Sequence, residues 1–375
     1  MRLLEVLETS GGGSGRHFID LCRGLTARGH VVHAIYSPLR AEERFVEELR
    51  SLELAGVHTV AMARAPGPSD VSAWRAIRAV MRSAGPFDVI HAHSSKAGAL
   101  SRIRLPGRHI PRVYTPHAFR TMDPGLGNLG RRIYGSIETM LARSFTDKLI
   151  CVSADEYAHA RALGISREKL SIIVNGVDPP PADSRDSERA ALGIPKDALL
   201  FGFVGRLCHQ KAPERLLAAF KLVAARVPNA HLLMVGSGEA ERAVLRQIET
   251  SGYAARIHLT SRFTGPQTMA SIDILTMPSR YEAMSYVMLE AAAAGKPLIL
   301  TEVGGASTVL KDGENGVLVG NDDDPQDFAD AMLRLSNSDR LLRYTDAAAA
   351  RARSPDYGLE RMISETESVY RSLVA

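Results

Sequence analysis

The sequence predicts two α/β domains, each with a parallel sheet that helices cover on both faces. Three observations support this prediction. Short apolar runs alternate with amphipathic stretches along most of the chain, glycine-rich turns follow the first apolar run and a later one, and a proline-rich segment after Asn175 separates two such cycles. The length of 375 residues also suits two domains of ordinary size.

The first cycle opens with the apolar run Leu3–Leu7, which we expect to be a strand, followed by the glycine-rich turn Thr9–Gly15. His17–Arg28 has apolar residues at helical spacing and ends at Gly29, a residue type that commonly stops helices. Further strands are expected at Val31–Tyr36, Val57–Ala61, Val89–Ala92, Val113–Thr115, Leu149–Val152 and Ile172–Val174. Further helices are expected around residues 40–54, 71–83 and 129–144.

A change of texture near Asn175 marks the expected boundary between the domains. The prolines in Asn175–Pro181 can continue neither a helix nor an interior strand. The second cycle has expected strands at Leu199–Val204, His231–Val235, Ile257–Leu259, Ile274–Met277 and Pro297–Thr301, and expected helices at Ala212–Val227 and Glu239–Ser251. We therefore expect domains over residues 1–178 and 179–354, with a helical tail over 355–375.

Composition excludes several classes of protein. The net charge of +4 is too small to argue for nucleic-acid binding. Residues 1–178 hold 24 basic against 17 acidic residues, a net +7 that could face phosphates or an anionic membrane. Three scattered cysteines argue against zinc and for a reducing compartment. The acidic N-terminus does not resemble a signal peptide and no segment is apolar enough to span a bilayer, so we expect a cytoplasmic protein.

The strongest motif is Pro278–Ala291, which follows an apolar strand and enters a helix. Ser285 is a plausible N-cap, and the free backbone N–H groups after it suit an anion such as a diphosphate. Glu282 and Glu290 flank this helix start, where they can accept hydrogen bonds from the hydroxyl groups of a sugar and a ribose. The plainer alternative is one glutamate that serves the helix dipole and one that is solvated.

Glu282 and Glu290, with seven residues between them, resemble the E-x7-E signature of retaining glycosyltransferases of family four, which have the GT-B fold. Other stretches resemble the family in the expected order: Thr9–Gly15, Phe87–His93, Tyr114–His117, Val174–Asp178, Val204–Leu207 with Lys211, Val303–Gly305 and Asp312–Gly316. The resemblance implies two Rossmann-like domains that face each other across a cleft, with the acceptor on the first and the nucleotide-sugar on the second. It also implies that the last helix returns to the first domain.

The resemblance assigns roles to individual residues. Glu282 and His117 would contact the donor sugar, Glu290 the ribose, and Arg206 and Lys211 the diphosphate. Without a metal, the charge of a departing diphosphate needs fixed cations, and arginine can supply two parallel hydrogen bonds. We therefore expect no metal and no cofactor, with a nucleotide-sugar as substrate, a UDP-sugar before a GDP-sugar. The remaining donor-binding residues would be Gly12, Gly13, Gly205, Ala283, Met284, Ser285 and Tyr286.

Several patterns limit this interpretation. Ala283-Met284-Ser285 stands where family members often have Gly-Phe-Gly. This departure leaves the identity of the donor sugar undetermined. The letters of a metal-binding D-x-D motif occur in Asp322–Asp324, but this polar loop is interpreted as solvated surface. The glycines of Thr9–Gly15 lack the spacing of a dinucleotide fingerprint. His91 and His93 lie on one side of a strand, where sheet packing is the simpler role for at least one of them.

The acceptor is the least specified partner. Arginines and apolar residues share the helical stretch Gly130–Arg143, which could lie on an anionic membrane or simply face the interior. We hypothesise a lipid-linked acceptor or a growing glycan in bacterial surface-polysaccharide synthesis, with peripheral membrane contact. Two alternatives stay open: a non-catalytic GT-B binding subunit, and a GT-B sugar-nucleotide epimerase that needs no acceptor.

Overall fold

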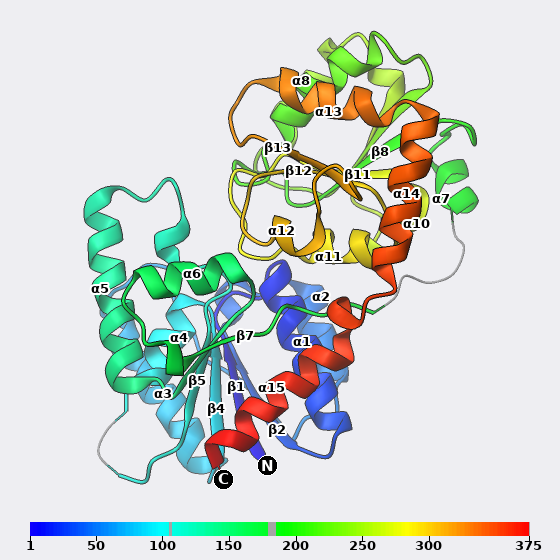
Figure 1. The fold of residues 1–375 in the computed structure, drawn as a ribbon. Coiled ribbons are helices and arrows are strands. Elements are labelled where there is room, and N and C mark those ends of the chain that lie inside the picture. The colour runs from blue at the N-terminus through cyan, green and yellow to red at the C-terminus, as the bar shows by residue number, and fades with distance from the viewer. Residues whose placement is uncertain (105–106, 179–184, 375) are drawn as a thin grey trace. The chain divides into compact units, whose positions relative to one another are not determined.

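The computed structural model describes residues 1–104, 107–178 and 185–374. The chain divides into two compact units, one formed by Met1–Asn175 with Leu359–Ala375 and the other by Gly176–Gly358 (Figure 1). The second unit begins at Gly176, three residues before the expected start of the second domain at 179. Residues 179–184, with which the second domain was expected to open, lie outside the described residues.

The first unit is built on a seven-stranded sheet, counted over the described residues, with the order β3-β2-β1-β4-β5-β6-β7 and every described pairing parallel. Its strands are β1 (Arg2–Leu7), β2 (Val31–Tyr36), β3 (Gly56–Thr59), β4 (Val89–His93), β5 (Arg112–Thr115), β6 (Lys148–Cys151) and β7 (Leu170–Ile172). Its helices are α1 (Gly13–Ala27), α2 (Glu43–Ser51), α3 (Ser69–Ser83), α4 (Ser95–Arg102), α5 (Asn128–Phe145), α6 (Ala154–Ala162) and α15 (Leu359–Val374).

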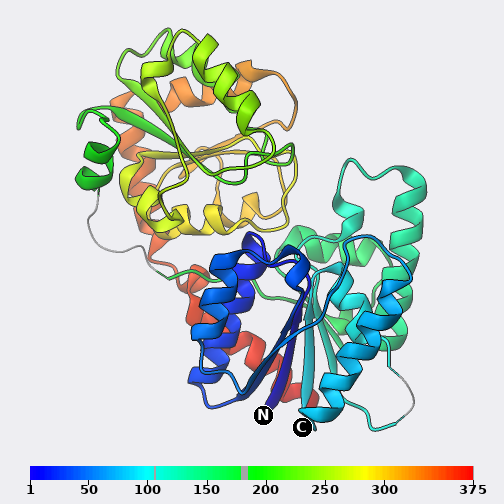
Figure 2. The same cartoon turned by 180° about the vertical axis from the view of Figure 1, so that it is seen from behind.

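Both faces of this sheet are buried, as the continuous apolar strands predict. Leu3 and Leu7 of β1 pack with α1, α2 and α15 on one face, whereas Leu4 and Val6 pack with α3 and α4 on the other. The two views of the ribbon show the tail helix α15, in red, beside the blue α1 (Figures 1 and 2). The last helix of the chain is thus part of the first unit.

The second unit repeats the architecture with the strand order β10-β9-β8-β11-β12-β13, and its described pairings are parallel. Its strands are β8 (Leu199–Val204), β9 (Ala230–Val235), β10 (Ile257–Thr260), β11 (Ile274–Met277), β12 (Leu298–Thr301) and β13 (Gly316–Val319). Its helices are α7 (Arg185–Ala191), α8 (Pro213–Ala224), α9 (Glu241–Thr250), α10 (Gly265–Ser271), α11 (Tyr286–Ala293), α12 (Ala306–Val309), α13 (Pro325–Leu335) and α14 (Ser338–Ala352). Phe201, Phe203 and Phe220 are fully buried in its core.

The expected elements differ from the structure in several short segments and in one longer stretch. The helices α4, α6, α7, α10 and α12, each of nine residues or fewer, were not predicted, and neither were β13 and the longer helices α13 and α14. The first helix begins at Gly13 rather than His17 because the glycine-rich turn continues directly into it. In the described part of the chain, no helix has the length and apolar content needed to cross a membrane.

Candidate active site

An ion pair joins two predicted site residues of the second unit. Lys211 lies between β8 and α8, and Glu282 lies between β11 and α11. Because β8 and β11 are parallel neighbours, both loops leave the carboxyl edge of the sheet, where ligands of such folds bind. Lys211 Nζ lies 2.6 Å from Glu282 Oε1, and the two side chains are only 16% and 8% exposed.

Two residues that the sequence analysis missed hold this pair in place. Gln210 donates from Nε2 to the carbonyl of Tyr281 at 3.0 Å and reaches Glu282 Oε2 at 3.5 Å. Arg280 donates from its backbone N–H to the Gln210 carbonyl at 2.8 Å, and its guanidinium binds the carbonyl of His209. The loops after β8 and β11 are therefore connected to each other by hydrogen bonds beside the ion pair.

The Asp322–Asp324 loop has structural partners. All three residues are exposed, as expected of surface. Asp323, however, accepts hydrogen bonds from Arg280 at 2.8 Å and Arg215 at 2.7 Å, and Asp324 caps the start of α13 through the backbone N–H of Gln326. The interpretation of this loop as surface is therefore confirmed, and Asp323 in addition forms exposed ion pairs with Arg280 and Arg215.

Glycines from two other loops let the backbone approach the site closely. A side chain at Gly304 would collide with the carbonyl of Glu282, and one at Gly305 would meet the Met284 sulfur at 2.6 Å. A side chain at Gly236 would strike the carbonyl of Gly205 in the loop before Lys211. Glycine is thus needed at these three positions because the loops that carry Lys211 and Glu282 leave no space for a side chain there.

The start of α11 has the predicted position but not the predicted cap. Ser285 is extended and precedes Tyr286, the first helical residue, yet its side chain makes no capping hydrogen bond. The expected Ser285 cap is therefore wrong as to its side chain, while the residue does mark the helix start. Ala283, Met284, Ser285 and Tyr286 are all buried, with exposed fractions of 7, 7, 6 and 7%.

Glu290 and Arg206 lie in different surroundings from the ion pair. The carboxylate of Glu290 packs against Gly265, the first residue of α10, where any side chain would collide with it. This helix begins with a capping box of Thr264 and Gln267, which the sequence analysis did not identify. Arg206 is exposed after β8, and its guanidinium makes no hydrogen bond or ion pair with the described residues.

In the first unit, the predicted loop residues lie at the start of α1. Gly12 precedes the helix with φ of 71°, and Gly13 is its first residue. One turn later, His17 is 2% exposed, and its Nδ1 lies 3.0 Å from Asn175 Oδ1. No described group bonds its buried Nε2.

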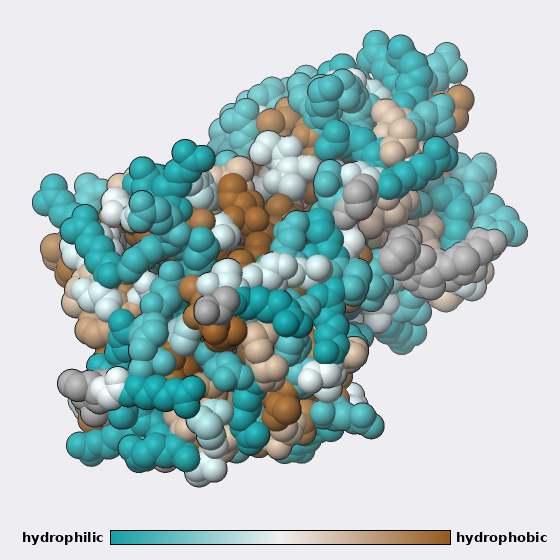
Figure 3. Space-filling model, turned by 60° about the horizontal axis from the view of Figure 1, so that its bottom comes forward, coloured by the Kyte–Doolittle hydropathy of each residue, from teal (hydrophilic) through white to brown (hydrophobic). Residues whose placement is uncertain are grey.

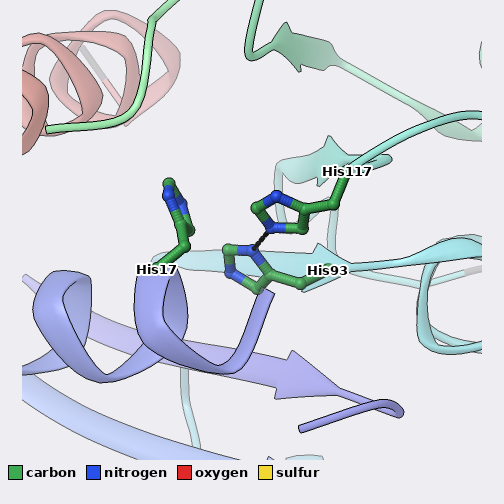
Figure 4. A group of neighbouring side chains, drawn as sticks. All are labelled: His17, His93 and His117. Atoms are coloured by element: carbon green, nitrogen blue, oxygen red, sulfur yellow. Dashed lines mark hydrogen bonds between the residues drawn. The ribbon is translucent and has the colours of Figure 1, made fainter. Parts of the chain in front are cut away.

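His17 belongs to a cluster of histidines in which His17 and His93 are buried and His117 is partly buried. His93, at the end of β4, places Nδ1 3.2 Å from Nε2 of His117, which follows β5 (Figure 4). The His17 ring meets the His117 ring edge-on, with centroids 4.7 Å apart. The sequence pattern expected sheet packing for at least one of His91 and His93, and it did not predict that His93 contacts His117 through a ring nitrogen.

The turn that carries His117 has a strained backbone, and a buried carboxylate accepts hydrogen bonds from its vicinity. His117 and Ala118 have φ of 52° and 81°, a conformation that residues with a side chain rarely adopt. Glu156 of α6 accepts the backbone N–H groups of Ala118 and Val152, each at 2.8 Å. Its carboxyl is fully buried, which raises its pKa from 4.5 to about 7. Glu156 thus fixes the His117 turn, although no motif identified it.

Two groups of side chains have the spacing of metal ligands. Ring nitrogens of His17, His93 and His117 lie within 4.8 Å of one another, and so do ligand atoms of Glu5, His91 and His93. Within the chain, however, His93 already has hydrogen-bond partners on both ring nitrogens, His117 and Glu5. The expectation that the protein uses no metal stays a prediction.

Both units of the chain match known protein families. Residues 198–338 match the family model described as glycosyl transferases group 1, and residues 11–180 match that of Glycosyltransferase Family 4. A D-inositol 3-phosphate glycosyltransferase of Nocardioides is 28% identical over 96% of this chain and 85% of its own length. An Escherichia coli UDP-Gal:alpha-D-GlcNAc-diphosphoundecaprenol alpha-1,3-galactosyltransferase is 27% identical over 77% of this chain and 76% of its own.

A solved structure shares the fold. HepE from Anabaena, crystallised with UDP and glucose, superimposes with a TM-score of 0.81 and 22% identity, covering 98% of this chain and 99% of that one. The family matches cover both units, and the two parallel sheets agree with the fold of this neighbour. The chain therefore belongs to glycosyltransferase family four, has the GT-B fold and is a glycosyltransferase.

Proposed function

We propose that this enzyme transfers a sugar from a nucleotide-sugar to an acceptor hydroxyl, with retention at the anomeric carbon. The Lys211–Glu282 pair carries the proposal, because it sets a cation for a diphosphate beside a carboxylate for sugar hydroxyls. A UDP-sugar is the first choice of donor and a GDP-sugar the second. The Escherichia coli relative named for UDP-Gal and the UDP-bound HepE structure support this choice.

In the proposed reaction, the bond between the anomeric carbon and the diphosphate oxygen breaks as the acceptor oxygen bonds to the same face of that carbon. The acceptor proton passes to the leaving diphosphate. Lys211 and the exposed Arg206 stabilise the developing negative charge, together with the N–H groups at the start of α11, so no metal is needed there. Glu282 turns from Lys211 toward sugar hydroxyls, with Gln210 keeping it oriented.

We assign the nucleotide-sugar to the second unit and the acceptor to the first. Glu290 would accept hydrogen bonds from the ribose, and His117 would meet the donor sugar. The strained and internally bonded turn of His117 supports a functional role, since such strain persists where surrounding groups enforce it. Gly12 and Gly13, at the start of α1, would lie near the diphosphate and acceptor.

A donor screen tests the proposal directly. UDP- and GDP-sugars are ranked by the rise in melting temperature they cause, because a ligand that binds only the folded state stabilises it. The best donor is then incubated with and without acceptor in excess EDTA, and the products are separated. Transfer with retention only when acceptor is present supports the proposal. Donor isomerisation without acceptor would indicate an epimerase, binding without turnover a non-catalytic subunit, and loss of transfer in EDTA a metal at the diphosphate.

We further propose that α5 brings the enzyme to the inner face of an anionic membrane, where a lipid-linked acceptor resides. The buried face of this helix is formed by Gly135, Glu138, Leu141 and Ala142. A separate apolar stripe of Leu129, Ile133, Ile137 and Met140 is exposed by 73, 51, 41 and 50%. The exposed Arg131, Arg132 and Arg143 can meet lipid phosphates. On the left of Figure 3, where Figure 1 draws α5, brown and tan side chains lie among teal ones.

Sedimentation with vesicles tests this membrane contact. The enzyme should pellet with vesicles of anionic lipid, less at high salt and less with zwitterionic lipid. Replacing Ile133 and Ile137 by serine should abolish pelleting. Leu342→Ser is the matched control, since Leu342 is a 62% exposed leucine on α14 of the second unit. Equal pelleting of both variants and wild type, or none by any of them, would refute the contact.

A further inference from the structure

A buried chain of hydrogen bonds connects the tail helix to His117. The Tyr370 hydroxyl on α15 donates to Glu5 Oε1 at 2.9 Å, and Glu5 Oε2 lies 2.9 Å from His93 Nε2. His93 Nδ1 then meets His117 Nε2 at 3.2 Å. Glu5, His93 and Tyr370 are each 0% exposed, so no water competes for these bonds. Residues from three segments that are far apart in sequence are thus linked by hydrogen bonds to the ring of His117.

The polarity of this chain follows from counting protons. A neutral imidazole has one N–H donor and one acceptor nitrogen. If Glu5 is ionised, both its oxygens accept, so His93 donates from Nε2 and must accept at Nδ1. His117 then donates from Nε2, and its Nδ1 is left as an acceptor.

Protonation of Glu5 reverses the direction of the two hydrogen bonds between Glu5, His93 and His117. The Tyr370 hydroxyl lies 2.5 Å from His91 Nδ1, and His91 Nε2 lies 2.8 Å from the Thr115 hydroxyl. With Thr115 donating to His91 Nε2 and His91 donating to the Tyr370 oxygen, Tyr370 keeps donating to Oε1. The carboxylic proton then lies on Oε2 and is donated to His93 Nε2. His93 must then carry its proton on Nδ1 and donate to His117 Nε2. His117 now holds its proton on Nδ1, which becomes a donor.

We propose that Glu5 is a positioning residue that determines, through His93, which ring nitrogen of His117 carries the proton. The outer nitrogen of His117 is thereby set as donor or acceptor toward a sugar hydroxyl. The consequence for transfer rests on the proposed role of His117, whereas the tautomer itself does not. The titratable groups that face Glu5 are Tyr370 from α15, His91 and His93 from β4, and Cys22 from α1.

The raised pKa of Glu5 means that this change of tautomer occurs at a pH that is easily reached in an experiment. Burial raises the pKa of Glu5 from 4.5 to about 8, against the opposing hydrogen bond from Tyr370. Burial also lowers the pKa of His93 to about 3, and that of His117 well below its usual value, so both rings are neutral when Glu5 titrates. A proton on Glu5 can therefore only redirect the rings and does not charge them.

Nitrogen-15 NMR of histidine-labelled enzyme reads the tautomers, because protonated and bare ring nitrogens resonate far apart. His93 and His117 are assigned with His93→Gln and His117→Gln. From pH 6.5 to 9.5, both wild-type rings should exchange their protonated nitrogens, with a midpoint near the pKa of about 8. Glu5→Gln should stay in the low-pH form, because its amide NH₂ faces His93 while its carbonyl accepts from Tyr370. Tyr370→Phe should move the midpoint to higher pH.

Internal controls and a second measurement make the test decisive. The hydrogen-bonded pairs His33–His58 and His231–His258 serve as references that should keep their tautomers. Wild-type rings that do not switch, or a Glu5→Gln enzyme that switches as wild type does, would overturn the proposal. One equivalent of tightly held metal per chain, found by elemental analysis, would also overturn it. Transfer kinetics that ignore the observed switch would instead refute the role of His117 in the proposed function.

Discussion

Lys211 and Glu282 are 71 positions apart in sequence, yet the ammonium of one lies 2.6 Å from the carboxylate of the other. The aliphatic carbons of Lys211 also pack on Gly205, where an added Cβ would meet them at 3.4 Å. Lys211 therefore contributes a charge and an apolar stem to different neighbours. A variant that removes only the charge can separate the two contributions.

We predict that Lys211→Met lowers turnover by about two orders of magnitude or more, the scale of losing one group that stabilises developing charge. Methionine keeps most of the stem over Gly205, so the melting temperature should change little. Steady-state transfer and thermal melts measure the two effects. Lys221→Met on α8, an exposed lysine, is the control and should behave as wild type. Wild-type turnover in Lys211→Met would remove Lys211 from the mechanism.

The structure brings together two of the residues proposed for the donor site, Lys211 and Glu282, but the sequence did not predict how they are connected. Glu282 and Lys211 stand in motifs, but their pairing depends on β8 lying beside β11, a strand order that no local pattern specifies. Arg280 acts through backbone carbonyls and Asp323, so its role follows from loop geometry rather than from a motif. The fold class was predictable because apolar strands alternate with amphipathic helices along both units of the chain.

The first-unit site was predicted least completely. The strand pattern correctly placed His91 and His93 on one face, and their ring centroids are 4.0 Å apart. Their partners could not be read from spacing, since Glu5 is 88 positions from His93 and Tyr370 is 365 positions from Glu5. A charged residue inside the apolar run Leu3–Leu7 was the available signal, because carboxyl groups are buried only with partners.

We predict that Glu156→Gln destabilises the first unit by about 1–3 kcal/mol and lowers turnover. Glutamine offers one acceptor where Glu156 supplies two, so the N–H of Ala118 or of Val152 is left buried without a partner. Urea unfolding and transfer kinetics measure the effects. Glu168→Gln, at an exposed position, is the control. Unchanged stability would show that Glu156 does not hold the His117 turn.

We predict that Gly304→Ala weakens donor binding and lowers stability by about 1–3 kcal/mol, the scale of overpacking. The added methyl would press on the carbonyl of Glu282 and shift the loop that carries its carboxylate. Calorimetry with UDP and thermal melts measure both effects. A Cβ at Gly67 would meet nothing within 4 Å, so Gly67→Ala should leave both quantities unchanged. Wild-type affinity for UDP in Gly304→Ala would place the donor away from this loop.

We predict that Glu367 on α15 makes the first unit less stable in acid. Burial alone would raise its pKa, but hydrogen bonds from Arg371, Arg28 and His30 lower it from 4.5 to about 2. A lowered folded-state pKa means that the stabilisation is complete above pH 4.5 and disappears as the pH falls toward 2. Glu367→Gln should therefore cost about 1 kcal/mol at pH 7, the scale of a partly exposed ion pair, and progressively less in acid.

Urea unfolding of wild type and Glu367→Gln between pH 7 and 3 measures this convergence. Glu360→Gln is the matched control, because Glu360 binds the same Arg28 from a side chain that is 82% exposed, where water screens the pair. The control should lose little stability at any pH. A constant difference between wild type and Glu367→Gln across the range would mean that the stabilisation does not depend on the charge of Glu367. In that case the contact between α15 and α1 would rest on the apolar packing of Met362, Ile363 and Tyr370 alone.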